Sequence, residues 1–325
     1  MTARHCGLQR GAIRSTVATL LLFAAMQCAQ AAPRSLLTPF GDFAIRAPNL
    51  PTRPEPPNYY ATSGPDPGWQ IAQWDIPAGR LSPFRTSREG AREVLTATSP
   101  EATVRLVRGP GSESITLVQD GAVLPCLTAK GEPRESDLFF SPKDRSSPGP
   151  KALTSDPVPL AGVRSLVLAT TVTFRIGATS RPKGCRVNQN MTLASVVLND
   201  RIARPPQTFF YQLALAPSCG PDSVPRWQPC DSGGQAAWFY STRRPFGADD
   251  YLPNLGERYL KNGERRALTV DVFPRIMRLI ESGPKPMDHD PRHWEVDNFY
   301  AGQAIWGDVR LSTTWERFQI VAHSK

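Results

Sequence analysis

The alternation of apolar residues between positions 163 and 216 limits the possible folds more than any other feature of this sequence. In the first run, one parity holds the apolar side chains of Leu166, Leu168, Val172, Phe174 and Ile176. Successive side chains of a β-strand point to opposite faces, so this spacing predicts a strand with one buried face. Residues 191–198 form a second β-rich run, and 209–215 form a third with clean alternation. No helical period separates the runs, and parallel neighbours would need crossover helices, so we expect antiparallel strands.

Shorter runs of the same kind extend the pattern in both directions. The predicted strands are 69–76, 104–107, 115–118, 123–127, 236–240, 268–272, 294–301, 306–311 and 315–321. We expect loops over 129–160 and 217–234, and a tight turn at Asp120-Gly121. Pro274 suits the first turn of a helix and Gly283 its end, which predicts one short helix over 274–282. So many short strands without an internal repeat predict a mostly β fold, an antiparallel β-sandwich of the jelly-roll, concanavalin-like type.

The N-terminal residues 1–31 have the pattern of a cleaved signal peptide. Three arginines precede an apolar run over 17–26, and Ala29-Gln30-Ala31 provides the small residues of a cleavage site. The apolar run is shorter than the roughly 20 residues that a membrane-spanning helix needs. We therefore expect a secreted or periplasmic protein with no transmembrane segment after cleavage. Residues 32–67, rich in proline, are expected to form an extended leader before a β-sandwich domain over 68–325.

Cysteine usage agrees with export. Two of the six cysteines belong to the predicted signal peptide, and the remaining four are Cys126, Cys185, Cys219 and Cys230. An even number in an exported chain predicts disulfides, although four cysteines allow three pairings. A Cys219–Cys230 bond would close a short loop, which leaves Cys126–Cys185 as the second pair. The alternative of a zinc site lacks C-x-x-C and H-x-x-x-H spacing, so we expect no metal and no cofactor.

The distribution of charge bears on the class of partner. The chain carries a formal net charge of +9, but its arginines are scattered along the sequence. A nucleic-acid groove would show clustered lysine and arginine with interleaved aromatic residues, and no such run is present. We therefore expect no nucleic-acid partner.

Two segments carry a resemblance to a known kind of protein. They are the run Phe209-Phe210-Tyr211-Gln212-Leu213 and the closing run from Tyr300 to Asp308. With their neighbouring strands they resemble secreted jelly-roll sandwiches of the lectin, carbohydrate-binding-module and glucanase kind. The resemblance implies a sandwich fold and a polysaccharide or glycan as partner. The acidic signature of laminarinase-like glucanases is absent, so the resemblance assigns no catalytic residue, and a shared fold does not establish function.

A carbohydrate site combines aromatic rings, which stack on the apolar faces of sugars, with polar groups that bind their hydroxyls. Aromatic residues that the core of a sandwich does not hold must lie on outer sheet faces or in loops. We predict a ligand site on a concave, aromatic-lined sheet face and its rim, built from Trp227, Trp238, Tyr240, Arg243, Arg244, Trp294 and Tyr300. Trp227 lies in a polar stretch, and the two arginines suit a uronic acid or a sulfated sugar.

Two other functions stay open at the level of sequence. A glycoside hydrolase or polysaccharide lyase would use paired carboxylates, for which the candidates are Asp249, Asp271, Glu295, Asp297 and Asp308. Glu295 and Asp297 share one parity and thus one strand face, but no spacing singles out a catalytic pair. We interpret the group Asp288-His289-Asp290 with His293 as a connecting loop rather than a metal site. The third possibility is a structural or interaction protein of the cell envelope.

Overall fold

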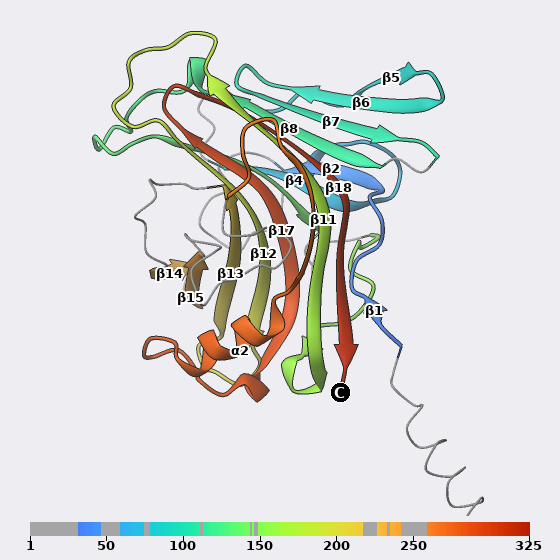
Figure 1. Cartoon of the computed structure of the whole chain (residues 1–325), viewed down its shortest axis with the longest axis vertical. Helices are drawn as coiled ribbons and strands as arrows, with labels where there is room; N and C mark the ends of the chain where they lie inside the picture. The colour runs from blue at the N-terminus through green and yellow to red at the C-terminus, as the bar shows by residue number, and fades with distance from the viewer. Residues whose placement is uncertain are drawn as a thin grey trace, which may run out of the picture.

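Two β-sheets lie face to face in the computed structural model (Figure 1). The eight-stranded sheet contains, in order across it, β16 (Arg265–Asp271), β11 (Val163–Ala178), β18 (Val309–Ser324), β8 (Ser114–Asp120), β7 (Ala102–Arg108), β6 (Arg92–Thr98) and β5 (Arg85–Glu89), with β1 (Arg34–Ser35) paired to β18. The ten-stranded sheet contains β14 (Arg226–Ser232), β15 (Gln235–Ser241), β13 (Gln207–Ala216), β12 (Gln189–Asp200), β17 (Trp294–Trp306), β9 (Glu135–Pro142), β4 (Pro67–Trp74), β2 (Asp42–Arg46) and β3 (Tyr59–Thr62), with β10 (Val158–Pro159) paired to β17. The predicted β-sandwich is confirmed.

The direction of the strands follows the expectation with two exceptions. Among the described strands, β2 pairs in parallel with β4, and β13 pairs in parallel with β15. The long central strands pair antiparallel, as in β12 with β13 and β11 with β18. The short strand β1 lies beside β18, whereas β4, which corresponds to the predicted strand 69–76, pairs with β2 and β9 in the other sheet.

The structure describes most of the chain from Ala32 onward. The described residues are 32–46, 59–74, 79–110, 113–143, 145, 149–216, 226–232, 235–241 and 259–325, with the backbone alone at Trp74, in β14 and in β15. The predicted signal peptide, Arg243, Arg244 and Cys219 lie outside the described residues, as does the side chain of Cys230. None of the helices in these ranges has both the length and the apolar composition of a membrane-spanning helix.

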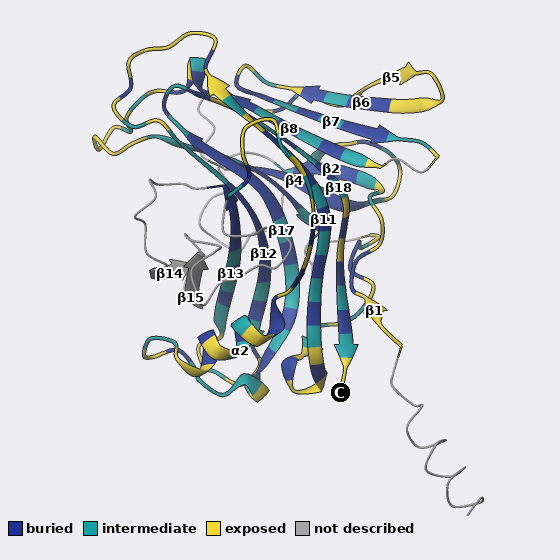
Figure 2. Cartoon of the chain, viewed as in Figure 1, coloured by how far each residue is buried: buried dark blue, intermediate teal, exposed yellow. Residues whose placement is uncertain are grey.

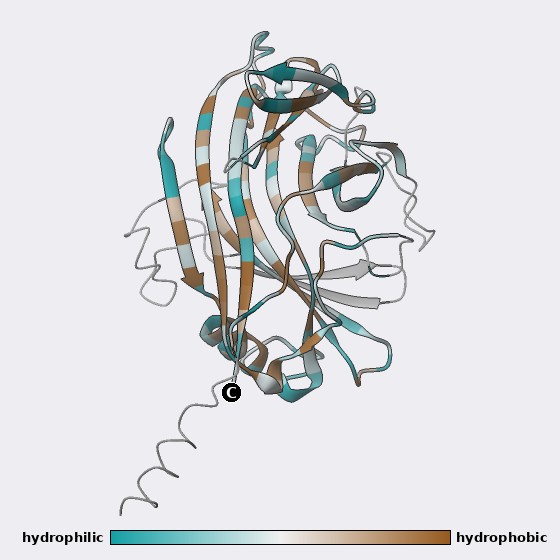
Figure 3. Cartoon of the chain, turned by 90° about the vertical axis from the view of Figure 1, so that its right-hand side faces the viewer, coloured by the Kyte–Doolittle hydropathy of each residue, from teal (hydrophilic) through white to brown (hydrophobic). Residues whose placement is uncertain are grey.

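Apolar side chains from the facing sides of the two sheets form the core. On β11 the predicted inward residues Leu166, Leu168, Val172 and Phe174 are buried. Figure 2 shows buried and partly exposed positions alternating along the central strands, and Figure 3 shows the matching alternation of hydropathy. Trp69, Trp294 and Trp315 are among the largest fully buried side chains. Because each aromatic side chain removes roughly 150–250 Å² from water, these rings supply a large share of the apolar burial.

The predicted short helix is present as α2 (Phe273–Glu281), at one end of the sandwich (Figure 1). Pro274 lies in its first turn, and Ile276 and Ile280 point into the core. The Asp271 carboxylate accepts hydrogen bonds from the N–H of Phe273 at the helix start and of Leu166 on β11, at 3.1 and 3.0 Å. The helix therefore closes the core at this end, and Asp271 attaches it to the sheet.

The described parts of the predicted leader, 32–46 and 59–67, belong to the sandwich. They contain β1 and β2, which pair with strands of the body, and β3, which pairs with β2. Leu36, Phe43 and Ile45 from this segment are buried in the core. These apolar residues are few and lie close to many prolines, so the sequence pattern did not predict the strands.

Three local predictions are corrected by the structure. Residues 123–127 do not form a strand, because the Asp120 carboxylate accepts from the Ala122 N–H and starts a 3-10 turn over Gly121–Val123. The predicted loop over 129–160 contains β9, in which Ser136, Leu138 and Phe140 alternate inward. Trp227 lies in β14 rather than in a loop.

The three predicted closing strands are two, because the predicted strands 306–311 and 315–321 belong to the single strand β18. Gly302 does not interrupt β17, which continues to Trp306. Gly302 has φ 153°, and a Cβ atom there would lie 2.3 Å from the carbonyl oxygen of Leu138 and 2.7 Å from the Cα of Phe139. The missing side chain thus lets β9 approach β17 closely. The chain reverses instead at Gly307, between β17 and β18.

We expect Gly302→Ala to destabilise the protein, because the new methyl group would overlap the β9 backbone. Overpacking of this kind lowers the free energy of unfolding by about 1–3 kcal/mol, and Tm by several degrees. The matched control is Gly177→Ala on β11, where a Cβ would meet no atom within 4 Å. Thermal unfolding followed by circular dichroism measures both, and equal melting of the two variants would contradict the close packing.

Cys126 and Cys185 form a disulfide, which confirms one of the two predicted pairs. Their Cα atoms are 5.3 Å apart, and 59 positions separate them in sequence. The bond joins the segment after β8 to the segment before β12. Cys126 lies in the connection from β8 to β9 and Cys185 in that from β11 to β12, and both connections pass from the eight-stranded to the ten-stranded sheet. The disulfide therefore joins these two connections.

Replacing both cysteines of this pair by serine should lower the free energy of unfolding by about 4 kcal/mol, the chain-entropy value for a loop of this length. Denaturant unfolding of the oxidised protein and of the double variant measures the difference. Adding reductant to the wild-type protein should reproduce most of it. A double variant as stable as the oxidised protein would show that the bond does not constrain the chain.

Candidate functional site

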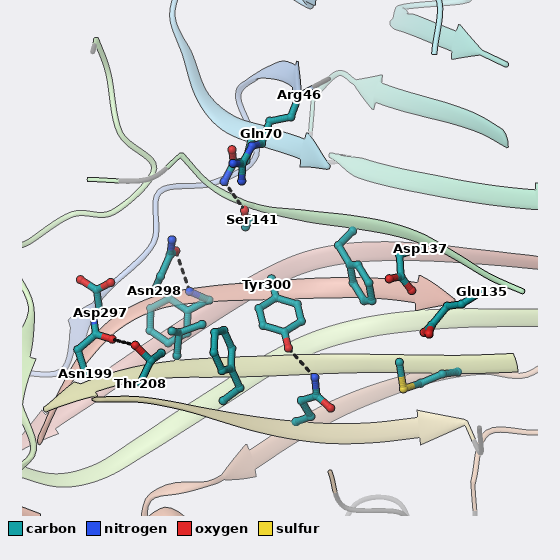
Figure 4. Close-up of a pocket in the computed structure, with 16 residues that line it drawn as sticks. Arg46, Gln70, Glu135, Asp137, Ser141, Asn199, Thr208, Asp297, Asn298 and Tyr300 are labelled. Atoms are coloured by element: carbon teal, nitrogen blue, oxygen red, sulfur yellow. Dashed lines mark hydrogen bonds between the residues drawn. The ribbon is translucent and has the colours of Figure 1, made fainter. Parts of the chain in front are cut away.

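The outer face of the ten-stranded sheet is hollowed. The cavity has a volume of about 610 Å³ and is lined from six strands (Figure 4). The lining residues are Arg46, Gln70, Glu135, Asp137, Phe139, Ser141, Met191, Val197, Asn199, Thr208, Phe210, Gln212, Asp297, Asn298, Phe299 and Tyr300. They come from β2, β4, β9, β12, β13 and β17, and all but Phe299, which belongs to the core, lie on the side opposite to the core. We call this cavity the groove.

Aromatic rings form the middle of the groove floor. The Tyr300 ring centroid lies 5.5 Å from that of Phe139 and 6.3 Å from that of Phe210, both in edge-to-face geometry. Phe139 is mostly covered, whereas Phe210 and Tyr300 are half-buried. The glycine at position 302 leaves the space beside Phe139, since a side chain there would overlap its ring. The floor therefore offers two partly exposed aromatic surfaces.

The phenol of Tyr300 is held by a neighbour across the sheet. Its hydroxyl accepts a hydrogen bond of 2.7 Å from the Gln212 side-chain amide, as Figure 4 shows. Burial raises the pKa of Tyr300 to about 12, against the lowering effect of its hydrogen bonds with Ser195 and Gln212. The group is thus a neutral hydroxyl at physiological pH.

A relay of hydrogen bonds forms the wall on the β3–β4 side. Tyr59 Oη donates to Gln70 Oε1 at 2.8 Å, and Gln70 Nε2 donates to Ser141 Oγ at 2.8 Å and to the Pro142 carbonyl at 3.1 Å. The Lys143 ammonium lies 5.2 Å from the centre of the Tyr59 ring, and burial lowers the pKa of that lysine. These contacts fix the Gln70 amide in one orientation.

The β17 edge of the groove contains a bulge at Asp297 and Asn298. On one side of β17, β9 pairs with it from Ala301 onward and β10 pairs with it at Glu295 and Val296. No described strand pairs with β17 on this side between Val296 and Ala301. Arg145 fills this gap: Nε lies 2.9 Å from Asp297 Oδ1, and Nη2 lies 3.0 Å from the Asp297 carbonyl oxygen. The guanidinium thereby replaces the missing strand partner and neutralises the carboxylate.

Charge differs between the two ends of the groove. Glu135 and Asp137 project from β9 beside Trp306 and Ala304 of β17. Arg46 lies on the far side, with Gln70 and Ser141 (Figure 4). Six residues of extended strand separate Glu135 from Ser141, or roughly 20 Å. A long ligand would therefore meet acidic groups at one end and mostly hydrogen-bond donors at the other.

The structure places the predicted site residues in three groups. Tyr300 lies in the groove floor. Trp294 is fully buried, with Nε1 donating to the Asp288 carbonyl oxygen, so its assignment to the ligand site is wrong. Its parity on β17 turns it to the core. Trp227, Trp238 and Tyr240 lie in β14 and β15 at the edge of the same sheet, where the backbone alone is described; Arg243 and Arg244 lie outside the described residues.

Most residues of the groove were not among the predicted site residues, although part of the signal is present in the sequence. Phe210 and Gln212 alternate with the core residues Phe209, Tyr211 and Leu213, so their parity marks the outer face of β13. Residues of β9 were missed because that strand was expected to be a loop.

The predicted carboxylates serve mainly structural roles. Glu295 and Asp297 do share a strand face, and burial raises the pKa of Glu295. Asp297 is paired with Arg145, Asp271 attaches α2, and Asp308 accepts from the backbone N–H of Lys183 and Cys185. Asp249 lies outside the described residues.

The segment around His293 forms a compact charged cluster. His293 Nδ1 lies 2.7 Å from Asp288 Oδ2, and Nε2 lies 3.6 Å from Asp290 Oδ2. The hydrogen bond with Asp288 raises the pKa of His293, and the charges of Asp290 and Asp200 act in the same direction against desolvation. In the part of the chain that the structure describes, no group of three or more His, Cys, Asp or Glu residues is arranged to hold a metal ion.

Comparison with known proteins returns structures but no sequence relatives. No protein-family profile and no curated protein matches the chain. The chain is similar to a family 12 xyloglucanase from Bacillus licheniformis, with 9% identity over 75% of this chain and 99% of that one, at a TM-score of 0.40. It is similar to endoglucanase 3 of family GH12 from Trichoderma harzianum, with 9% identity over 81% and 100% of the chains, at a TM-score of 0.35.

The family 11 xylanase from Neocallimastix patriciarum is a third similar structure, with 10% identity over 78% of this chain and 96% of that one, at a TM-score of 0.34. The scores are too low to bear on activity, and the fold of this chain rests on its own sheets.

We expect His293 to make the stability of this end of the molecule depend on pH. Because its pKa is raised in the folded state, its contribution is complete below the unfolded value of about 6.5 and is lost as pH rises through the folded value. The Tm difference between the wild type and His293→Gln should therefore be largest in mild acid and shrink in mild alkali. In an Asp288→Asn background the pH dependence of this difference should largely disappear; an unchanged dependence would assign it to another group.

Proposed function

We propose that this protein binds a carbohydrate chain in the groove on the outer face of its ten-stranded sheet. The observation that carries the proposal is the composition of one cavity: the half-buried rings of Phe210 and Tyr300 lie among amide, hydroxyl and carboxylate side chains. Sugars need this mixture, because their C–H faces stack on rings while their hydroxyls require donors and acceptors. A groove for an apolar ligand would not place so many polar groups beside the rings.

The groove suits binding more directly than hydrolysis. Cleavage of a glycosidic bond requires two carboxyl groups that flank the bond, roughly 5–9.5 Å apart. Glu135 and Asp137 project side by side from one strand, so they do not flank a bond from two sides. The third carboxylate, Asp297, accepts a hydrogen bond from Arg145. We therefore assign the groove a binding role and treat glycoside hydrolysis and elimination as outcomes to be measured.

We also propose that the chain is exported to the periplasm or the cell exterior. The signal pattern over residues 1–31 supports this, as does the Cys126–Cys185 disulfide, because such bonds persist in oxidising compartments. On this proposal the mature protein begins near Ala32, and the sandwich with its N-terminal strands is the functional unit. Trp227, Trp238, Tyr240, Arg243 and Arg244 remain proposed as ligand-binding residues at the edge of the sheet beyond β13.

Phe210→Ala should weaken glycan binding about three- to tenfold, because one ring contact contributes roughly 0.5–1.5 kcal/mol. A glycan array selects the ligand, and isothermal titration calorimetry then measures the affinity of wild type and variant. Thr173→Ala, on the outer face of the eight-stranded sheet, is the matched control and should bind as the wild type does. Far-UV circular dichroism and Tm should stay near wild type, since the Phe210 ring is half-buried.

The same ligand separates the three candidate functions. Binding without release of reducing ends or of unsaturated sugars supports the proposal. Release of reducing ends that disappears in Glu135→Gln or Asp137→Asn reassigns the groove to a glycoside hydrolase, and an unsaturated product reassigns it to a lyase. An array with no hit for the folded wild-type protein contradicts carbohydrate binding and favours a structural or interaction role.

A further inference from the structure

The hydrogen bonds inside the groove wall determine which atoms are left for a ligand. At Gln70 the orientation of the amide follows from chemistry, because the Pro142 carbonyl can only accept and so must face Nε2. The same nitrogen donates to Ser141 Oγ at 2.8 Å. Ser141 Oγ therefore acts as an acceptor toward the wall, and its own O–H proton is directed elsewhere. Ser141 lines the groove, so its hydroxyl is available there as a donor.

Asn298 is oriented by the same kind of constraint. The N–H of Phe299 donates to Asn298 Oδ1 at 2.8 Å, at the bulge of β17. A backbone N–H can only donate, so the oxygen must face it and Nδ2 must face away. Figure 4 shows the Asn298 side chain rising from β17 into the cavity. Its two N–H groups are thus presented to the groove.

A third amide repeats the pattern on the neighbouring strand. Thr208 Oγ1 donates to Asn199 Oδ1 at 2.8 Å, which uses the amide oxygen and leaves Asn199 Nδ2 as the outward group. The amide oxygens of Asn298 and Asn199 thus face neighbouring protein groups, and Ser141 Oγ accepts from Gln70, so these three residues turn donors to the groove. Thr208 Oγ1, which gives its proton to Asn199, can only accept from a ligand.

The local charge agrees with this polarity. Arg46 lines the groove on the same side as Ser141, and the Asp297 carboxylate at the β17 edge forms an ion pair with Arg145 at 2.9 Å. Glu135 and Asp137 lie toward the other end of β9. Donors at Ser141 and Asn298, with a guanidinium on the same side and Asp297 already paired, suit an anionic, acceptor-only group.

We propose that the groove binds an acidic glycan, with a hexuronate carboxylate at Ser141 and Asn298 beside Arg46. This inference rests on the proposed function and specifies its ligand class. A carboxylate has acceptors alone, so it matches these donors better than a hydroxymethyl group, which brings a proton of its own. The acidic end of the groove would then accept hydrogen bonds from the hydroxyls of the following sugars.

The test compares two oligosaccharides of equal length and linkage, a β-linked glucose oligomer and the corresponding glucuronate oligomer. Titration calorimetry at low salt should show the wild-type protein binding the glucuronate oligomer roughly tenfold or more tightly, since hydrogen bonds to charged groups are the stronger ones. Raising the salt concentration should reduce this preference, because the groove is open to solvent.

Two variants localise the effect. Asn298→Asp keeps an oxygen for the Phe299 N–H but replaces the outward donors by a negative charge, and Ser141→Ala removes the hydroxyl donor. Each should reduce glucuronate affinity roughly tenfold and glucose-oligomer affinity by a clearly smaller factor, because a hydrogen bond to a neutral hydroxyl contributes less than one to a carboxylate. Ser312→Asp, on the outer face of the eight-stranded sheet, adds the same charge away from the groove and should leave both affinities unchanged.

The outcomes separate the two proposals. If the folded wild type binds neither oligomer nor any glycan on the array, the proposed function fails. If it binds the glucose oligomer as tightly as the glucuronate oligomer, or if Asn298→Asp weakens both equally, carbohydrate binding stands and the acidic subsite is overturned. Retained secondary structure and Tm in each variant exclude misfolding as the cause.

Discussion

The turn at Gly307 and Asp308 sets how the two sheets lie against each other. It joins β17, in the middle of one sheet, to β18, in the middle of the other. Gly307 has φ 71°, and a Cβ there would lie 2.0 Å from the Val187 carbonyl oxygen. Burial alone would raise the pKa of Asp308, but the N–H groups of Lys183 and Cys185 and the Lys183 ammonium hold it at about 2. An ionised carboxylate thus ties this turn to the segment that carries the Cys185 disulfide.

The groove depends on the position of β17 that this turn determines. With Trp306 beside Glu135 and Gly302 beside Phe139, Tyr300 reaches the middle of the floor, opposite Ser195 of β12. Beyond it the bulge at Asp297 and Asn298 turns two successive polar side chains to the groove, which a regular strand cannot do. The bulge leaves backbone groups without a strand partner, and Arg145 and the Asn298 side chain satisfy them. The hydrogen bonds that satisfy the backbone of the bulge therefore also orient the polar side chains of the site.

Strand parity explains which parts of this molecule could be predicted from sequence. Where one face is buried and the strand is long, as in β11 and β13, alternation identified both the strand and its inward residues. Read on the other parity, the β13 run already contained Phe210 and Gln212, two lining residues of the groove. Trp294 was predicted in the ligand site because it is aromatic, whereas its parity on β17 places it on the core side. β5 is exposed along its whole length and β9 is flanked by charged and proline-rich residues, so neither shows the pattern that burial imposes.

The donor character of the groove could not be predicted from the sequence, because it depends on contacts between strands. Ser141 is a donor toward the groove because Gln70, on the neighbouring strand, is turned by the Pro142 carbonyl, and Gln70 in turn accepts from Tyr59. Gln70 and Ser141 are separated by 71 positions in sequence, and no spacing rule relates them. Hydroxyl and amide side chains can each donate or accept, so composition alone leaves their polarity open. A backbone carbonyl can only accept and a backbone N–H can only donate, so the Pro142 carbonyl fixes the Gln70 amide and the Phe299 N–H fixes the Asn298 amide. The donors that the groove offers at Ser141 and Asn298 follow from these two backbone contacts.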